Sequence, residues 1–313
     1  MNIFVTGASG FVGKQLVLAM LRAGTFKVTV TARKQPVFSK ECKVHFGSID
    51  DKTDWSEALR NQQVVIHAAA RAHKLNDTAS DPLTAYRSVN VDGTLKLARE
   101  AANAGVERFI FISSIKVNGE STNANNPFRA DDKPAPIDQY GVSKFEAEKG
   151  LVEIANDTGL EIVIIRPPLV YGAGVKGNFD RLAKVVRTGL PLPLASITNF
   201  RSLVSIDNLV DLLITCVDHP RAANEVFLVS DDDDLSTPEL LRGIAKAMGQ
   251  PSRLFPCLPT MLTTIARCIG KKKEVDRLFG SLQVDIDKTK SLLEWSPPVS
   301  VEEGLKRCFP NSA

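Results

Sequence analysis

A tyrosine and a lysine four residues apart could carry out proton transfer. Tyr140 and Lys144 lie in a stretch that predicts a helix beginning at Gln139, and this spacing puts both side chains on one face of the helix. A tyrosine hydroxyl has a pKa of about 10, but a nearby lysine ammonium favours the phenolate. Ser114, at the end of a predicted strand, can hydrogen-bond the same substrate oxygen. The three residues suggest an acid-base centre, although such a Tyr-Lys pair also occurs on solvent-exposed helices.

A glycine-rich turn near the start of the chain predicts a dinucleotide site. Residues 2–5 form an apolar run of strand length, Gly7, Gly10 and Gly13 follow, and apolar residues then recur at helical spacing. Glycines allow a tight turn, close approach of a diphosphate and close packing of helix on strand, and the helix N-terminus attracts the anion. The spacing is G-x-x-G-x-x-G rather than G-x-G-x-x-G. We expect the dinucleotide to contact Gly7, Ser9, Gly10, Phe11, Val12 and Gly13.

The end of the second predicted strand bears on the choice of dinucleotide. Residues 26–32 are rich in β-branched side chains, which favours a strand. NAD-selective sites usually carry an acid about 20 residues beyond the glycines, whereas an arginine there accommodates a 2′-phosphate. Arg33 stands at that distance with no acid beside it. We therefore expect NADP, with NAD as the alternative; its nicotinamide would move a hydride while Tyr140 moves the proton.

Strands and helices alternate along the chain, which predicts an α/β fold with a Rossmann-type doubly wound parallel sheet. Residues 109–112 are apolar on both faces, as a central parallel strand should be. Ser113 and Ser114 follow at its carboxyl end, where ligands bind in such sheets. Further strands are expected at residues 44–47, 64–67, 162–166 and 225–230, and helices at residues 55–59, 82–104, 179–187 and from 139 onward. Small residues just past a strand end leave room for the cofactor, which we expect to contact Ala68, Ala69 and Ala70.

Length and composition exclude several classes of protein. The 313 residues are 43% hydrophobic and 24% charged, an ordinary globular composition. The net charge of +3, from 39 basic and 36 acidic residues, is too balanced to indicate binding to nucleic acid. Five scattered cysteines indicate neither disulfides nor a zinc site. Because the first residues already form a core strand rather than a signal peptide, we expect a cytoplasmic protein.

Two further stretches could suggest a membrane or a metal. Residues 254–266 are uncharged and apolar, but a spanning helix needs about 20 such residues. We expect a buried or pocket-covering helix, with membrane-surface contact through residues 254–273 as the alternative. The four acids at residues 231–234 lack the alternation of a calcium loop. They predict a solvated turn, and we expect no metal.

Together the motifs resemble the extended short-chain dehydrogenase/reductases, and more narrowly the nucleotide-sugar epimerases, dehydratases and reductases. The resemblance covers nearly the whole chain and rests on residues 6–13, 67–70, 113–114, 140–144 and 166–172. Members often have an Asp where this chain has Ser48. The resemblance implies that the catalytic residues are Ser114, Tyr140 and Lys144. It implies further cofactor contacts at Ile49, Asn90, Tyr140, Lys144 and Pro167.

The same resemblance implies a domain organisation and an assembly. Residues 1–166 would bind NAD(P), and residues 167–313 would mainly bind a nucleotide sugar, with about 200–230 returning to the first sheet. A homodimer would form through the helices at residues 82–104 and 140–156.

A UDP-sugar would bind at residues that the resemblance also places. Asn178 would take the diphosphate, and Leu192 would lie against the uracil. Arg201 and Arg277 would clamp the diphosphate, for which guanidinium groups are well suited, although each could be a surface ion pair. The sugar would meet Ser114 and Lys116. Lys116 and residues 69–73 also resemble a subgroup, found with bacterial surface-polysaccharide genes, that handles UDP-N-acetyl sugars; there His73 would line the pocket, or else lie on the surface.

The sequence excludes one reaction of this family and leaves two. A 4,6-dehydratase carries an Asp-Glu pair directly after the catalytic serine, where this chain has Ile115 and Lys116. Hydride chemistry at C4 remains. A reductase would take a UDP-4-keto-6-deoxy-N-acetylhexosamine, whereas an epimerase with tightly bound NAD would invert UDP-glucose or UDP-N-acetylglucosamine. Arg33 favours the reductase, since an epimerase is expected to have the ribose-binding acid; a non-catalytic dinucleotide sensor is a third possibility, which the intact Tyr140 opposes.

Overall fold

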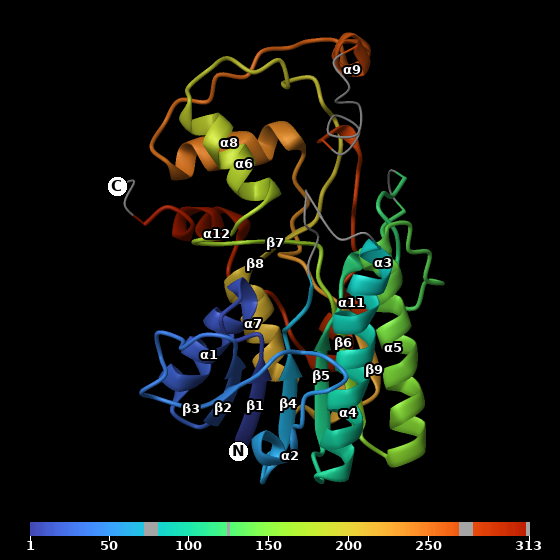
Figure 1. Cartoon of the computed structure of the whole chain (residues 1–313). Helices are drawn as coiled ribbons and strands as arrows, with labels where there is room; N and C mark the ends of the chain where they lie inside the picture. Colours follow the sequence, from blue (N-terminus) through green and yellow to red (C-terminus); the bar gives the residue numbers. More distant parts are fainter. Residues whose placement is uncertain (72–80, 124–125, 269–277, 311–313) are drawn as a thin grey trace.

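Seven parallel strands form the main sheet of the protein (Figure 1). The computed structural model describes residues 1–71, 81–123, 126–268 and 278–310. The strand order is β3-β2-β1-β4-β5-β6-β9, with every neighbouring pair parallel, so the expected doubly wound Rossmann-type fold is confirmed. The strands are β1 (Asn2–Thr6), β2 (Lys27–Ala32), β3 (Lys43–Phe46), β4 (Val64–His67), β5 (Arg108–Ile112), β6 (Glu161–Arg166) and β9 (Glu225–Leu228).

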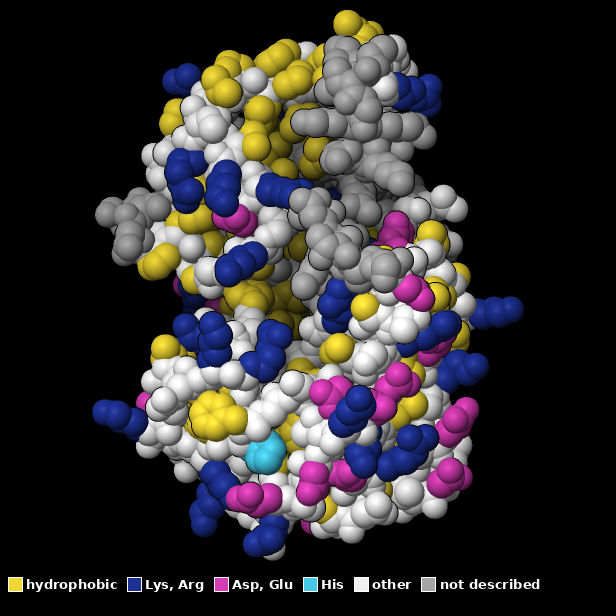
Figure 2. All heavy atoms as spheres, viewed as in Figure 1, with side chains coloured by type: hydrophobic (Ala, Val, Ile, Leu, Met, Phe, Trp, Pro, Cys, Tyr) yellow, Lys and Arg dark blue, Asp and Glu magenta, His cyan; other side chains and the backbone are white. Residues whose placement is uncertain are grey.

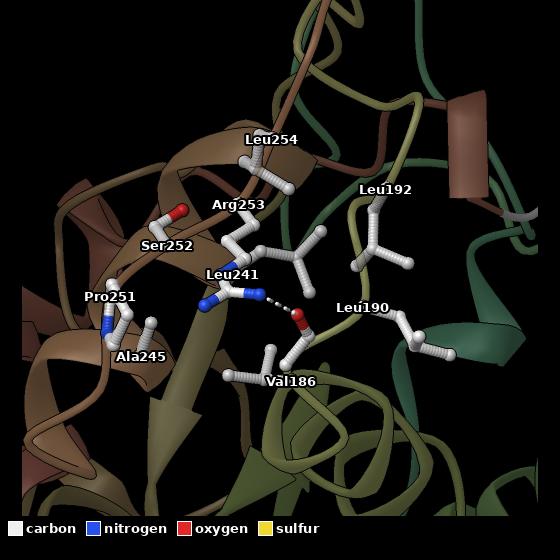
Figure 3. A pocket seen from close by; sticks show the side chains of 10 residues that line it. Val186, Leu190, Leu192, Leu241, Ala245, Pro251, Ser252, Arg253 and Leu254 are labelled. Carbon is white, nitrogen blue, oxygen red and sulfur yellow. Dashed lines mark hydrogen bonds between the residues drawn. The ribbon is translucent and has the colours of Figure 1, made fainter.

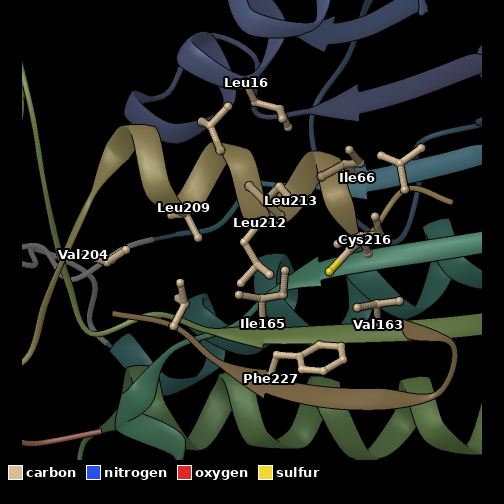
Figure 4. Packing of buried hydrophobic residues seen from close by; sticks show 14 of the residues in the cluster. Leu16, Ile66, Val163, Ile165, Val204, Leu209, Leu212, Leu213, Cys216 and Phe227 are labelled. Carbon is tan, nitrogen blue, oxygen red and sulfur yellow. The ribbon is translucent and has the colours of Figure 1, made fainter. Parts of the chain in front are cut away.

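Helices cover both faces of this sheet because alternate strand residues enter two separate cores. In β1, Ile3 and Val5 belong to one core and Phe4 to the other. Helices α1 (Phe11–Ala23) and α7 (Ile206–Thr215) lie side by side over the first core, in which Leu212 of α7 faces Ile165 of β6 (Figure 4). The second core is closed by α4 (Gly93–Asn103) and α5 (Gln139–Thr158).

Beyond β6 the chain leaves the main sheet, builds a smaller unit and returns. Strands β7 (Leu169–Tyr171) and β8 (Leu203–Ser205) pair in a separate two-stranded sheet, and α7 and β9 then rejoin the first unit. A third core lies among α6 (Asn178–Arg187), α8 (Thr237–Ala247) and α12 (Val301–Arg307). The other elements are α2 (Ser56–Leu59), α3 (Pro82–Arg87), η1 (Ser88–Asp92), η2 (Ile115–Val117), η3 (Pro220–Ala222), α9 (Pro259–Cys268) and α11 (Asp287–Leu293).

Two local predictions differ in part from the structure. The helix expected over residues 82–104 is interrupted by a π-helical turn, η1, which carries the buried Asn90; such turns are frequent at functional sites. Of the acids at 231–234, Asp232 and Asp233 are exposed as expected, but Asp231 is buried and accepts hydrogen bonds from the Tyr171 hydroxyl at 2.7 Å and the Ser205 N–H at 2.8 Å. Asp231 therefore ties β7 and β8 to the end of β9.

In the part of the chain that the structure describes, no helix has the length and apolar character needed to cross a membrane. The same residues include no group of three His, Cys, Asp or Glu side chains placed to hold a metal ion. Helix α9 carries exposed Met261, and Leu258 just before it is also exposed. The helix expected from residues 254–266 is therefore shorter and partly open to solvent.

Candidate active site

Tyr140 and Lys144 lie one turn apart at the start of α5. Asp138 caps this helix, because its side chain accepts a 2.7 Å hydrogen bond from the Gly141 N–H. The Lys144 side chain is almost fully buried, with its Nζ 3.7 Å from the centre of the Phe111 ring on β5. The helix start thus holds the lysine against the carboxyl end of the central strands.

Ser114 lies two residues after the end of β5 and caps the N-terminus of the short helix η2. Its side chain accepts a 3.3 Å hydrogen bond from the Lys116 N–H. The backbone of the next residue is fixed as well, since the Ile115 N–H donates to the Pro167 carbonyl oxygen at 3.0 Å. Ser114 and Pro167 therefore occupy neighbouring strand ends, after β5 and β6 respectively.

The surroundings shift the pKa values of both ionisable residues. Burial lowers the pKa of Lys144 to about 7, and the charge of Glu148 opposes that change. Burial, with smaller contributions from Asp138 and Tyr86, raises the pKa of Tyr140 above its ordinary value. The sequence predicted that Lys144 would favour the Tyr140 phenolate. In the protein alone the pKa of Tyr140 is instead raised, because burial outweighs any effect of the lysine charge.

The sequence analysis assigned no role to Tyr86, which lies beside Tyr140, or to Arg71, which contacts Tyr86 in turn. The ring of Tyr86 on α3 packs edge-on against that of Tyr140, with centroids 6.1 Å apart, and is itself buried. The guanidinium carbon of Arg71 lies 5.7 Å from the centre of the Tyr86 ring. Tyr86 is four residues before Asn90, and this helical spacing was the one signal in the sequence that could have placed it beside the site.

Asn90 links the end of β4 to α5. Its side-chain oxygen accepts from the Arg71 N–H at 2.8 Å, and its amide donates to the Ser143 hydroxyl at 3.0 Å. The Ser143 hydroxyl in turn donates to the Tyr140 carbonyl oxygen at 2.8 Å. The buried Asn90 amide is thus occupied within the protein, which suits a supporting residue better than a direct cofactor contact.

The glycine turn forms a cradle with no room for side chains. Gly7 has φ +70°, and a Cβ there would lie 2.7 Å from the Ala69 backbone nitrogen. A Cβ on Gly13 would lie 2.3 Å from the Gly7 carbonyl oxygen. The N-terminus of α1 carries no acid in its first turn, and its N-cap residue, Gly10, makes no side-chain cap. Its N–H groups are therefore suited to a diphosphate, and the cradle fits a dinucleotide.

The remaining predicted cofactor residues lie at the same edge of the sheet. Arg33 is exposed just beyond β2, and Ile49 is half-buried against Gly93 of α4. The small residues after β4 leave the strand end partly open. The other predicted contacts in the turn, Ser9, Phe11 and Val12, are exposed or half-exposed, as are Ala68, Ala69 and Ala70.

The predicted substrate residues come from both units, and a hollow is visible on the surface between these units (Figure 2). Lys116 forms ion pairs with Asp138 and, at 3.2 Å, with Glu120. Asn178 is exposed at the start of α6. Basic side chains gather above and below the hollow in this view. Arg277 and His73 lie outside the described residues.

Leu192 and Arg201 lie in the second unit. The backbone of Leu192 bonds to residues 253 and 255, beside a small pocket lined mainly by apolar side chains, where Arg253 donates to the Gly189 carbonyl oxygen at 3.2 Å (Figure 3). Arg201 Nη1 donates to the Gly280 carbonyl oxygen at 3.0 Å, and burial lowers the pKa of Arg201. A half-buried arginine of this kind can receive an anion.

The sheet, the glycine cradle and the Tyr140–Lys144 pair define a dinucleotide-dependent oxidoreductase of the Rossmann type. The model of the NAD dependent epimerase/dehydratase family matches residues 3–230. The chain belongs to this family, and the resemblance to extended short-chain dehydrogenase/reductases is confirmed.

Individual relatives agree with this assignment. The chain is 49% identical over 307 residues to a UDP-glucose 4-epimerase of Vibrio cholerae, which covers 98% of this chain and 94% of the relative. It is 29% identical to an N-acetyl-alpha-D-glucosaminyl-diphospho-ditrans,octacis-undecaprenol 4-epimerase of Escherichia coli O157:H7, over 98% and 93% of the two chains. The UDP-glucuronic acid 4-epimerase of Bacillus cereus in complex with NAD superposes with a TM-score of 0.79 at 23% identity, covering 99% and 98% of the two chains, and so shares the fold.

Proposed function

We propose that the protein is a nucleotide-sugar 4-epimerase that inverts C4 of a UDP-hexose with NAD bound. The observation that carries this proposal is the 49% identity, along almost the whole chain, to a UDP-glucose 4-epimerase. It favours what the sequence analysis held as the alternative to a reductase. The site chemistry suits both reactions, because each moves a hydride and a proton at one sugar carbon.

Each catalytic residue has a role in this scheme. Tyr140 takes the proton of the C4 hydroxyl as the carbonyl forms, and returns it when the alcohol is restored. Ser114 hydrogen-bonds the same oxygen and keeps it in line with Tyr140. Lys144, when protonated, stabilises the phenolate of Tyr140. When bound, the nicotinamide supplies the hydride chemistry and a positive charge.

The nucleotide part of the substrate would bind across the hollow. Among the described residues, we assign Arg201 and Asn178, which is at the N-terminus of α6, to the diphosphate, and Leu192 to the base. We assign Lys116 to the sugar end, where it would leave Asp138 and Glu120 on binding. We also propose the domain division at residue 166, where β6 ends, and a homodimer through α4 and α5.

A second candidate is the reductase of a UDP-4-keto-6-deoxy-N-acetylhexosamine for surface-polysaccharide precursors. Arg33 and Lys34 are both exposed just beyond β2, where an acid usually selects NAD. These cations favour NADPH as a dissociable reductant. An epimerase has no need of such selectivity, because its cofactor is regenerated in every turnover.

One experiment separates the candidates. The purified protein is denatured and any released nucleotide is identified; the native protein is then incubated with UDP-glucose and UDP-N-acetylglucosamine without added cofactor. We expect bound NAD and inversion at C4. An empty site with no inversion, and NADPH oxidation only with a UDP-4-keto-6-deoxy sugar, would establish the reductase. Dinucleotide binding with neither reaction would point to the non-catalytic sensor.

A further inference from the structure

A buried ion pair lies directly behind the candidate active site. Glu148 on α5 and Arg166 at the end of β6 are each only 4% exposed. Arg166 donates from Nε to Glu148 Oε1 at 3.0 Å and from Nη2 to Oε2 at 2.6 Å. The Ser113 hydroxyl also donates to Glu148 Oε1, and Arg166 Nη1 donates to Asn118 Oδ1 at 3.0 Å. Both carboxylate oxygens and all three guanidinium nitrogens are therefore bonded.

This network joins three elements at the points where they carry site residues. The Ser113 N–H donates to the Ile165 carbonyl oxygen at 2.7 Å, so β5 and β6 are already held together by their backbones. Glu148 adds α5 to that pair of strands. Each member of the network lies close in sequence to a proposed site residue. Ser113 directly precedes Ser114, Arg166 directly precedes Pro167, and Glu148 lies one helical turn after Lys144.

Stability alone does not account for this arrangement. The free-energy cost of burying two charges is about as large as the gain from pairing them. Apolar side chains of similar volume at these positions often give a protein of equal stability. A bidentate pair with a serine donor instead fixes direction and distance. Glu148 is also on the buried face of α5 that Lys144 occupies, four residues further along.

We propose that Glu148 is a positioning residue: held by Arg166 and Ser113, it fixes Ser114 relative to α5 and places a negative charge one helical turn from Lys144. The proposal rests on the function proposed above, because it assigns roles within the same catalytic site.

The groups around Lys144 make Glu148 the source of that charge. The Phe111 ring of β5 faces the ammonium. His67 of β4 stacks on Phe111 and is neutral, because burial lowers its pKa to about 3. On α5 itself, Tyr140 is protonated at neutral pH, since burial raises its pKa. Burial lowers the pKa of Lys144 to about 7, and Glu148 is the group that raises it.

The test follows the titration of Lys144 directly. The protein is labelled with 13C at lysine Cε, and the Lys144 signal is identified by its loss in Lys144→Met. We expect a midpoint of about 7 in the wild type and a midpoint lower by about one unit or more in Glu148→Gln. The alkaline limb of kcat should move to lower pH by the same amount. This signal requires no substrate, so it reports on Glu148 even if the wild type inverts no sugar and the proposed function fails.

The chain offers a matched control on the outer face of the same helix. Glu146 forms a bidentate pair with Arg87 at 2.8 and 2.5 Å, and Glu146→Gln should leave the Lys144 midpoint unchanged. An unchanged midpoint in Glu148→Gln would overturn the electrostatic role.

Ser113→Ala keeps the ion pair and tests position alone: we expect kcat to fall about tenfold with KM unchanged. Should Glu148→Gln fail to fold, wild-type kcat in Ser113→Ala would overturn the proposal.

Discussion

The side-chain nitrogen of Lys144 lies 3.7 Å from the centre of the Phe111 ring. The contact joins α5 to β5 on the buried side of the site. An ammonium over an aromatic face gains roughly 0.5–2 kcal/mol. Phe111 therefore offsets part of the cost of burying the lysine charge, which otherwise lowers the pKa of Lys144.

Replacing Phe111 with leucine should make Lys144 easier to deprotonate. Without the ring, the pKa of Lys144 falls below its value of about 7, and kcat at neutral pH should drop about threefold to tenfold. The pH profile of kcat measures this change. Phe109→Leu is the control, since Phe109 is equally buried on the same strand and also contacts His67. Equal profiles for the two variants would contradict the role of Phe111.

Substitutions of the neighbouring Tyr140 and Tyr86 test the catalytic role of a hydroxyl separately from the packing of a ring. Tyr140→Phe removes the proton-transfer group, so kcat should fall roughly 10²- to 10⁴-fold while dinucleotide binding persists. Tyr86→Phe keeps the edge-on ring contact with Tyr140 and should retain kcat within about threefold. Turnover and dinucleotide affinity are measured for both. Substantial turnover by Tyr140→Phe would rule out the proposed mechanism.

Arg33 provides a test of cofactor choice. Because it is exposed at the end of β2, Arg33→Asp replaces a cation for a 2′-phosphate with an acid for the ribose hydroxyls. We expect the ratio of the dissociation constants of NADP and NAD to rise about tenfold or more. Lys27→Asp, at the opposite end of the same strand, should leave the ratio unchanged. If Arg33→Asp also leaves this ratio unchanged, Arg33 does not contact the ribose.

The features that the sequence could predict are those with local causes. Runs of apolar and β-branched residues alternating with helical patterns predicted the strands β1, β4 and β5, because each of these strands is apolar along its own length. The spacing of Tyr140 and Lys144 was enough to put them on one helix face. The glycine cradle could be predicted for the same reason, because Gly7 and Gly13, which pack against each other, belong to one strand-turn-helix segment.

The features that escaped prediction depend on partners distant in the sequence. In the sequence, Arg166 and Glu148 cannot be told from solvent-exposed charges, because they meet only where β6 packs against α5. Phe111 likewise contacts Lys144 only where β5 packs against α5. Asp231 stands in an acidic run that reads as solvated, yet it is buried because Tyr171 and Ser205 supply donors. Whether a charged side chain can be buried depends on its hydrogen-bond partners, and the periodicity of the sequence does not reveal those partners.

His67 gives a prediction for the pH dependence of stability. The ring is buried at the end of β4, with Nδ1 2.7 Å from the Thr6 hydroxyl and Nε2 3.0 Å from that of Thr94. Burial, and then the charge of Lys144, lower its pKa to about 3, whereas an unfolded histidine has a pKa of about 6.5. As pH falls below that value, the unfolded chain binds a proton that the folded protein cannot. Stability that is fully present above about pH 6.5 is therefore lost towards pH 3.

Between pH 7 and pH 5 this group should cost about 2 kcal/mol of unfolding free energy. In His67→Gln the difference between the two pH values should shrink by that amount, because no imidazole is left to protonate in the unfolded chain. Urea denaturation at both pH values measures it. His219→Gln, which removes a half-exposed imidazole, should shrink the difference far less. If His67→Gln keeps the wild-type difference, the acid sensitivity arises elsewhere, and His67 is not held neutral by its burial.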